Sequence, residues 1–408
     1  MPGECRWGSV QRHSASWLTT NVSDRHPEES VEGAGHRADA CDVVVVGAGI
    51  VGAAVAVRLS RQGLRVAVLE AQQVAGGATG RSAGLLLTGV PGHYHWAVQF
   101  FGREAARALW ELSVEGREHL MEAAAHLGVR VERTGSLALA VTEKEAGALR
   151  ASAELLREDG FDVGFSRTDP LQRGFLAALQ RPDDGVVDAA DLTRALLASA
   201  PVTVHPGTEV QGLEAEGADI RVWAYRRTVR CGAVVLAAGG YAPTLEPTLS
   251  RWVNRGQALL VTGQVENGGA RSLATPCYAD YGYEYASLLP DGRLLLGAWR
   301  YPRRPSSPEH SPDPDAALRE GLSRFARRYF PEVEGHVVQR WTGIIGCTPD
   351  GVPVVGALPH LPGVYFALGL GGWGLCWAFV AAERVVEMML EGVPAGLLDA
   401  RRRETGRR

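Results

Sequence analysis

Residues 42–70, DVVVVGAGIVGAAVAVRLSRQGLRVAVLE, decide the fold of this chain. The β-branched run Val43–Val46 is typical of a strand buried on both faces. An apolar helical pattern follows to about Gln62, where Gly63 ends it, and a second strand is predicted over 65–69. These elements predict a β-α-β unit.

Three glycines at G-x-G-x-x-G spacing join the first strand to the helix. Gly47 allows a tight turn, Gly49 lets a phosphate approach the backbone, and Gly52 lets the helix pack close to the strand. Glu70 ends the second strand 18 residues beyond Gly52, where a carboxylate accepts hydrogen bonds from ribose hydroxyls. The combination favours dinucleotide binding over a plain strand–helix turn.

The loop after Glu70, residues 76–84 (GGATGRSAG), contains small residues and one arginine. NAD enzymes have no standard need for such a loop. A flavoprotein needs the chain to run close along the pyrophosphate and the isoalloxazine ring, where small residues and backbone N–H groups fit. The loop therefore favours FAD.

Composition limits the class of protein. At 408 residues the chain predicts two intertwined domains, and its 46% hydrophobic and 22% charged content is ordinary for a soluble globular protein. A net charge of −4 gives no argument for a nucleic-acid or anionic-membrane partner. We see no apolar run of about 18 residues, the length that a membrane-spanning helix needs. The composition does not indicate an oligomeric state.

The ends and the cysteines indicate a cytoplasmic protein. The first 40 residues lack an apolar signal segment, so 1–40 is expected to be a disordered tail and 396–408 a basic one. The six cysteines are scattered without a C-x-x-C pair, which suits a reducing cytoplasm and predicts no metal site.

The rest of the chain mixes helices and strands. Amphipathic helices are predicted over 103–127, 143–158 and 318–329, with another beginning at Asp188. The strands are predicted over 137–141, 202–205, 209–213, 220–224, 229–231, 234–240, 257–262, 283–289, 294–298 and 337–342. A proline- and serine-rich loop is expected over 302–314.

Several separated segments resemble the FAD-dependent D-amino-acid oxidase superfamily, which includes glycine oxidase, sarcosine oxidase and γ-glutamylputrescine oxidase-like enzymes. They are the opening β-α-β unit, ATGRSAG, VDAADLTRAL, AVVLAAGGYAP and the block RWTGIIGCTPDGVPVVGALPHLPGVYFALGLGGWGL. The resemblance implies an α/β fold in which a discontinuous Rossmann-type FAD-binding domain carries an inserted α+β substrate domain with an antiparallel sheet. The FAD-binding segments would be 41–100, 186–245 and 336–395, and the substrate segments 101–185 and 246–335.

The resemblance also implies a reaction and a cofactor site. It implies oxidation of a C–N bond of a small amine or amino acid by hydride transfer to flavin N5, followed by hydrolysis of the imine. The residues it assigns to FAD are Gly47, Gly49, Gly52, Glu70, Thr79, Gly80, Arg81, Ser82, Val210, Gly239, Gly371, Gly372, Trp373, Gly374 and Leu375.

Three departures from relatives refine these expectations. Seven residues before Asp350, where sarcosine oxidases attach flavin to a cysteine, this chain has Gly343, and residues 80–84 contain no histidine, so non-covalent FAD is predicted. Some relatives activate oxygen with a lysine, but the only lysine of this chain, Lys144, is a poor candidate for that role. The electron acceptor is therefore either O2 or another acceptor. Arg255 and Arg81 are alternative cations that could assist the reaction with O2.

The third departure concerns the substrate. Many relatives have a carboxylate-binding arginine before the turn Pro290–Gly292, where this chain reads YASLL over 285–289. The difference favours an amine without an α-carboxylate, although Arg293, Arg300 or Arg340 could reach the pocket.

An apolar aromatic pocket would favour the neutral amine, because burying an ammonium is costly. Tyr281, Tyr283 and Tyr285 alternate, which predicts one face of a strand, lining either the pocket or the core. The candidate catalytic residues are Trp373, Tyr285, Tyr283, His95 and Arg255. His95, expected in a loop with His93, is either a general base or a solvated loop histidine.

A second G-x-G-x-x-G spacing, Gly369, Gly371 and Gly374, precedes a helix predicted over 375–390. No later strand ends in an acidic residue, so a second dinucleotide site is not expected. The resemblance instead implies that these glycines lie against the flavin ring, with Trp373 where many relatives have histidine. Two alternatives remain: an alcohol dehydrogenase of the glycerol-3-phosphate dehydrogenase type, and a non-catalytic flavin-binding protein.

Overall fold

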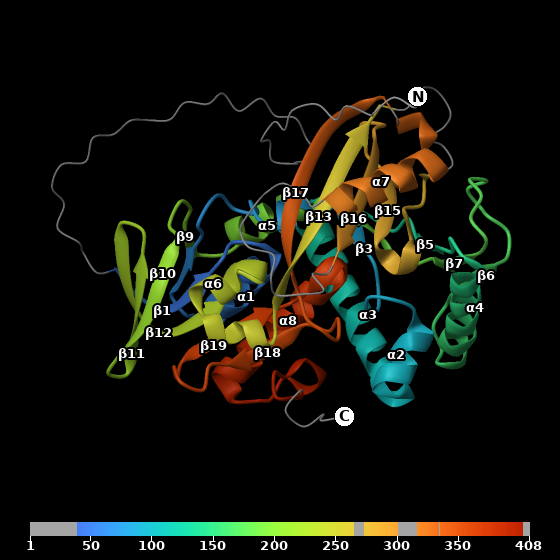
Figure 1. The fold of residues 1–408 in the computed structure, drawn as a ribbon. Helices are drawn as coiled ribbons and strands as arrows, with labels where there is room; N and C mark the ends of the chain where they lie inside the picture. The colour runs from blue at the N-terminus through green and yellow to red at the C-terminus, as the bar shows by residue number, and fades with distance from the viewer. Residues whose placement is uncertain (1–38, 265–272, 301–315, 334, 403–408) are drawn as a thin grey trace.

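The computed structural model describes residues 39–264, 273–300, 316–333 and 335–402. The ribbon contains two large sheets: one lies beside α1 and α8, and the other lies beneath α7 (Figure 1). The predicted loop over 302–314 and residues 1–38 of the predicted tail 1–40 lie outside the described residues, whereas residues 39 and 40 belong to the first strand.

The first sheet contains the predicted β-α-β unit. Strand β1 (Asp39–Val46) pairs in parallel with β2 (Val66–Leu69) and β12 (Arg227–Leu236), and α1 (Ile50–Arg61) connects β1 to β2. The other strands are β9 (Val202–His205), β10 (Val210–Glu216), β11 (Asp219–Ala224), β18 (Val354–Ala357) and β19 (Val364–Leu368). Strands distant in the sequence thus meet around β1.

Helices bury the apolar run of β1. Helix α1 packs against α5 (Ala189–Ala198) and α8 (Gly374–Glu391). Val44 and Val45 have no exposed surface, and they belong to two different core clusters because successive residues of a strand point to opposite faces. The continuous valine run is therefore buried on both faces, as predicted.

The second sheet carries α7 (Ala316–Tyr329) on one face. Its order is β17 (Val337–Cys347), β13 (Asn254–Gly263), β16 (Leu294–Arg300), β15 (Glu284–Leu288), β14 (Cys277–Ala279), β5 (Ser136–Leu139), β7 (Ala178–Arg181) and β6 (Gly164–Ser166). The pairs are antiparallel except β14 with β5. β17 pairs with β13 in this sheet, although the predicted FAD-binding segment 336–395 includes β17. The limits of the two domains stay a prediction.

Three helices lie beneath the second sheet in Figure 1: α2 (Tyr94–Phe101), α3 (Arg103–His126) and α4 (Glu143–Glu158). Helix α3 packs closely on α8 and so connects this region to the first sheet. The remaining elements are β3 (Leu85–Leu86), β4 (Val131–Glu132) and β8 (Gly185–Val187), which form a small sheet, and α6 (Ala242–Leu245).

The predicted alternation of three tyrosines on one strand is wrong. β15 begins only at Glu284, because Asp280 and Tyr281 have φ values of 50° and 57° and turn the chain. Tyr285 alone of the three lies in the strand. The expectation that His95 lies in a loop is also wrong, since it is in the first turn of α2.

The predicted C-terminal tail is wrong for residues 396–402. Leu398 and Ala400 are buried, and Arg402 donates to the Val352 carbonyl at 2.7 Å. Burial of Leu398 and Ala400 therefore holds this arginine-rich segment against the first sheet. Among the described helices, none combines the length and the apolar character required to cross a membrane.

Candidate active site

The first glycine turn is closely packed. Gly47 has a φ of 104°, and a Cβ at this position would lie 2.8 Å from the Ala237 carbonyl oxygen. A Cβ on Gly52 would lie 1.9 Å from the Gly47 oxygen, so only glycine allows α1 to start this close to β1. Gly49 caps α1 without a side chain, and the Ile50 amide donates to Thr79 Oγ1 at 3.1 Å. The helix N-terminus thus combines backbone donors with a positive dipole end, which suits a phosphate.

Glu70 lies beside this turn at the end of β2. Its two carboxylate oxygens accept from the amides of Ala48 and Gln72, each at 2.8 Å. The backbone therefore fixes the carboxylate at the edge of the glycine turn, where a ribose would lie.

The loop after Glu70 is tied to the second sheet. Thr79–Arg81 form a short 3-10 helix, and the Arg81 guanidinium donates to the carbonyls of Gly76 and Thr342, each at 3.1 Å. Trp341 Nε1 donates to the Arg81 carbonyl at 3.0 Å. Ser82 Oγ accepts from the Gly84 amide. Arg81 thus has a clear local role in joining the loop to β17.

Two further predicted cofactor residues lie in the first sheet. Val210 begins β10, next to a register shift, and Gly239 follows β12 in a short 3-10 helix. The amide of Thr208, two residues before Val210, donates to the Glu70 carbonyl at 2.7 Å. This bond holds the start of β10 beside the end of β2.

The second glycine segment connects β19 to α8. Gly371–Trp373 form a 3-10 turn, and α8 begins at Gly374. A Cβ on Gly371 would meet nothing within 4 Å, whereas one on Gly372 would lie 3.3 Å from Trp299 Nε1. The backbone before α8 therefore presents open space on one side and the second sheet on the other.

Aromatic side chains of the second sheet meet this segment. The cross-strand register places Tyr278 opposite Tyr285, and Tyr285 lies over Gly297, where a Cβ would be 2.1 Å from its ring. The Trp373 ring centroid lies 5.7 Å from Tyr278 and 6.5 Å from Trp299. We name these four residues, Tyr278, Tyr285, Trp299 and Trp373, the aromatic wall. Burial raises the pKa of Tyr285 and raises that of Tyr278 to about 12, so both phenols stay neutral.

Trp373 tests whether this site fits a flavin. Its side chain is 2% exposed, yet Nε1 has no hydrogen-bond partner among the described residues. A buried indole N–H normally has a partner. With the open side of Gly371, this unpaired donor fits a planar group that bears acceptor atoms.

The structure does not bring all the predicted catalytic residues together. Tyr283 contacts Trp299 of the aromatic wall at a centroid distance of 5.3 Å. His95 Nδ1 lies 3.1 Å from Ser152 Oγ of α4 instead, and burial, followed by the nearby His93, lowers its pKa. Arg255 donates to the Gly240 carbonyl at 2.9 Å and contacts Thr244, so its guanidinium stabilises the segment that follows β12.

Sequence reasoning missed Glu145, which is fully buried at the start of α4. Thr142 and Glu145 match the S/T-x-x-E capping signature, and Thr142 Oγ1 accepts from the Glu145 amide at 3.1 Å. The signature was available in the sequence, but it indicates a helix start rather than a long-range contact.

Comparison with known proteins identifies the family of this chain. The model of the DAO family, described as FAD dependent oxidoreductase, matches residues 42–388. The chain belongs to the DAO family of FAD-dependent oxidoreductases. FAD is therefore its cofactor, and the predicted enzyme class is confirmed.

Two relatives match over most of their length. The chain is 25% identical over 400 residues to γ-glutamylputrescine oxidoreductase of Escherichia coli (strain K12), with 93% of this chain and 90% of that protein covered. It is 27% identical over 365 residues to glycine oxidase of Bacillus licheniformis, with 86% and 93% covered.

Solved structures support the fold. Glycine oxidase from Geobacillus kaustophilus superposes with a TM-score of 0.69 at 24% identity, covering 87% of this chain and 95% of that one. L-proline dehydrogenase from P. horikoshii superposes with a TM-score of 0.72 at 22% identity, covering 91% and 100%. The predicted fold class, a Rossmann-type FAD-binding part with a second part, is confirmed.

Proposed function

We propose that this protein oxidises a C–N bond of a small amine, with non-covalently bound FAD as the electron acceptor. The observation that carries the proposal is the aromatic wall, which faces the glycine segment before α8 and includes a buried, unpaired Trp373 Nε1. FAD, when bound, would accept the two electrons that leave the substrate carbon, which travel together as a hydride.

The chain's own residues hold the cofactor and orient the amine. The N-terminus of α1 would bind the pyrophosphate, Glu70 would bind the ribose, and the segment before α8 would support the flavin ring. The aromatic wall excludes water and disfavours the ammonium form, since burying that charge is costly. It also holds the reacting carbon in place, which reduces the entropic part of the barrier.

The positions of two arginines support an amine without an α-carboxylate. Arg293 donates to Asp291 at 2.7 Å and to Gln339 at 3.0 Å, next to the turn at Gly292. Arg340 lies opposite Val261 and lines a small cavity with it on the α7 side of the sheet. Arg293 is therefore paired with Asp291 and Gln339, and Arg340 faces the α7 side of the sheet.

Non-covalent binding is supported by β17. Gly343, which occupies the register position of the flavin-linking cysteine, has no side chain to form the bond. Cys347 lies four residues later, and burial raises the pKa of its thiol to about 12, so it stays protonated and unreactive.

The reduced flavin would pass its electrons to O2 or to another electron acceptor. The Lys144 side chain is exposed in the first turn of α4. We place the protein in the cytoplasm, since no disulfide joins any two of the five cysteines of the described residues.

A purified sample tests the proposal. The protein should be yellow, and acid precipitation should release the flavin into the supernatant. Under anaerobic conditions, a panel of primary and secondary amines should bleach the flavin absorbance near 450 nm (a wavelength typical of flavins). Bleaching by glycerol 3-phosphate but by no amine would favour the alcohol dehydrogenase alternative. Bleaching by dithionite alone would favour a non-catalytic flavin protein.

A further inference from the structure

The turn between β14 and β15 has a costly backbone conformation. Asp280, Tyr281 and Gly282 have consecutive φ values of 50°, 57° and 91°. The left-handed region suits glycine, whereas side-chain-bearing residues adopt it only when their surroundings impose it. Such strain often marks functional sites, so the contacts that impose it are informative.

This turn packs directly on the aromatic wall. A Cβ on Gly282 would lie 2.1 Å from Trp373 Cη2, and the Gly282 carbonyl accepts from Trp299 Nε1 at 2.8 Å. Any movement of the turn must therefore move either Trp373 or Trp299. The turn sets one boundary of the proposed substrate site.

A buried carboxylate holds the turn from the other side. Glu145 Oε1 accepts from the Tyr281 amide at 2.6 Å, and Oε2 accepts from the Val141 amide at 2.9 Å. The Glu145 side chain has no exposed surface. Hydrogen bonds from two backbone amides suit a buried carboxylate, which needs donors to remain charged. One of these donors belongs to the strained residue itself.

His93 completes the contact. Its ring lies 4.9 Å from the Tyr281 ring, and its Nε2 lies 3.3 Å from Glu145 Oε1. The side chain is 2% exposed, and Nε2, although it faces Glu145, makes no hydrogen bond within the described residues. Burial, followed by the charges of Glu145 and Asp280, raises the pKa of Tyr281, so the carboxylate acts on the tyrosine as well as on its amide.

We propose that Glu145 and His93 are positioning residues, which hold the 280–282 turn against Trp373 and thereby fix the aromatic wall for hydride transfer. The inference rests on the proposed function. It assigns the two residues no contact with the reacting atoms. Their effect passes through the backbone of Tyr281 and the position of Gly282.

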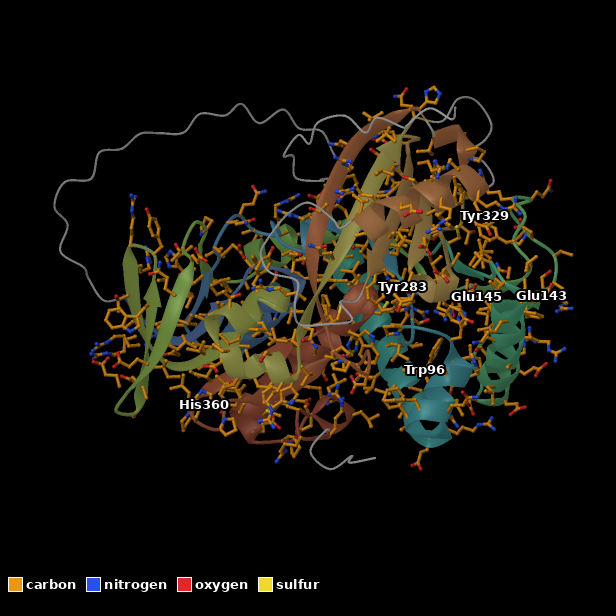
Figure 2. All side chains as sticks on the ribbon, viewed as in Figure 1. Trp96, Glu143, Glu145, Tyr283, Tyr329 and His360 are labelled. Carbon is orange, nitrogen blue, oxygen red and sulfur yellow. The ribbon has the colours of Figure 1, made fainter. Side chains whose placement is uncertain are left out.

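Figure 2 labels Glu145 and Glu143 at the same end of α4, with Tyr283 nearer the centre of the molecule.

Glu145→Gln in the FAD-loaded protein tests the inference, with Glu143→Gln as the control. Glu143 lies in the same helical turn, but its side chain is 77% exposed and pairs only with Arg167 among the described residues. The glutamine side chain in the Glu145→Gln variant keeps the size of the original but offers one acceptor oxygen where two amides need one each. We expect the variant to retain FAD and to show at least tenfold faster hydrogen exchange in the peptide 277–286.

The same variant should reduce flavin at least tenfold more slowly at saturating amine, with a much smaller change in KM, because the geometry of transfer changes more than binding does. Glu143→Gln should match the wild type in both measurements. Unchanged exchange, or faster exchange with an unchanged reduction rate, would overturn the positioning role. A wild-type protein that no amine reduces would instead overturn the proposed function, while hydrogen exchange would still report on the turn.

His93→Phe provides a second variant if Glu145→Gln does not fold. It keeps a ring against Tyr281 and removes the nitrogen that faces Glu145. We expect faster exchange in the same peptide and slower flavin reduction, both by a smaller factor than in Glu145→Gln. Wild-type values for both would remove His93 from the proposal.

Discussion

At the scale of single residues, Trp373 is central to the proposed site. It lies at the start of α8, contacts Tyr278 and Trp299 of the second sheet, and keeps a buried N–H without a partner among the described residues. Trp373 is therefore one of the side chains that connect the start of α8 to the second sheet. Its substitution should therefore affect chemistry more than cofactor content.

Trp373→Phe is expected to retain FAD but to reduce flavin about tenfold more slowly with amine, equivalent to about 1.4 kcal/mol of barrier. The phenyl ring keeps most of the packing, whereas the N–H is lost. Anaerobic stopped-flow absorbance measures the rate. Trp223→Phe, at a 43% exposed position of β11, is the control. Equal rates for Trp373→Phe and the wild type would exclude Trp373 from the site.

Glu118 predicts a pH dependence of stability. Hydrogen bonds from Arg133, together with those from Arg117, lower its pKa to about 2 despite partial burial. The folded-state pKa is depressed, so this stabilisation is present above the ordinary value of about 4.5 and is lost as the pH falls towards 2.

Glu118→Gln should accordingly lower the free energy of unfolding at pH 7 by about 1 kcal/mol, a value reduced for the solvent exposure of the pair. The difference from the wild type should shrink between pH 4.5 and pH 2. Urea denaturation at several pH values measures both. The exposed Glu122→Gln of the same helix is the control, and a constant difference at all pH values would contradict the assignment.

At the scale of elements, the crossing of α3 and α8 determines where the second glycine segment lies. A Cβ on Gly116 of α3 would lie 1.9 Å from the Cys376 carbonyl oxygen and 3.1 Å from Val380 Cγ2. Cys376 is two residues into α8, directly after the segment that faces the aromatic wall. The helix contact therefore controls the distance between the two sheets.

Gly116→Ala should separate the helices, with a loss of about 1–3 kcal/mol from overpacking. Because α8 must move at its N-terminus, FAD content should fall as well. Gly147→Ala on α4 is the matched control, since a Cβ there would meet nothing within 4 Å. That variant should gain about 0.5–1 kcal/mol from the better helix propensity of alanine. Thermal unfolding and bound-flavin fluorescence test both, and a Gly116→Ala protein with wild-type stability would contradict the close crossing.

At the scale of the whole molecule, a buried carboxylate joins segments from separate elements. Asp184 has no exposed surface and accepts from Thr88 Oγ1 at 2.9 Å, Ser136 Oγ at 2.7 Å and Arg117 at 3.4 Å. Ser136 belongs to the second sheet, and Arg117 to the helix that packs on α8. The side chains of this network come from segments that are far apart in the sequence. Their hydrogen bonds hold the second sheet against α3, which packs on α8.

Asp184→Ala should destabilise the protein by about 3–5 kcal/mol, because it leaves buried donors and a buried guanidinium without this acceptor. The neighbouring Asp183→Ala should cost less than about 1 kcal/mol, since that side chain is 55% exposed. Chemical denaturation of the two variants side by side gives the comparison. Similar losses for both would show that the buried network does not hold the second sheet against α3.

The sequence by itself determined the local parts of this protein. The β-α-β unit follows from the valine run, the glycine spacing and Glu70, because each depends on residues that are neighbours along the chain. The family and the cofactor follow from the same motifs together with the GLGGWG segment. Sequence periodicity also indicated the amphipathic helices that became α3 and α4, and a helix was predicted over 375–390, within α8.

Only the tertiary structure decided which distant side chains meet. The sequence pattern placed Tyr281, Tyr283 and Tyr285 on one strand, but the left-handed turn at Tyr281 separated them, and cross-strand register brought Tyr278 opposite Tyr285 instead. The sequence pattern also did not indicate that Glu145 accepts a hydrogen bond from the Tyr281 amide, which is 136 positions away. Motifs encode local geometry, whereas long-range contacts depend on strand register and helix crossings, which no single segment specifies.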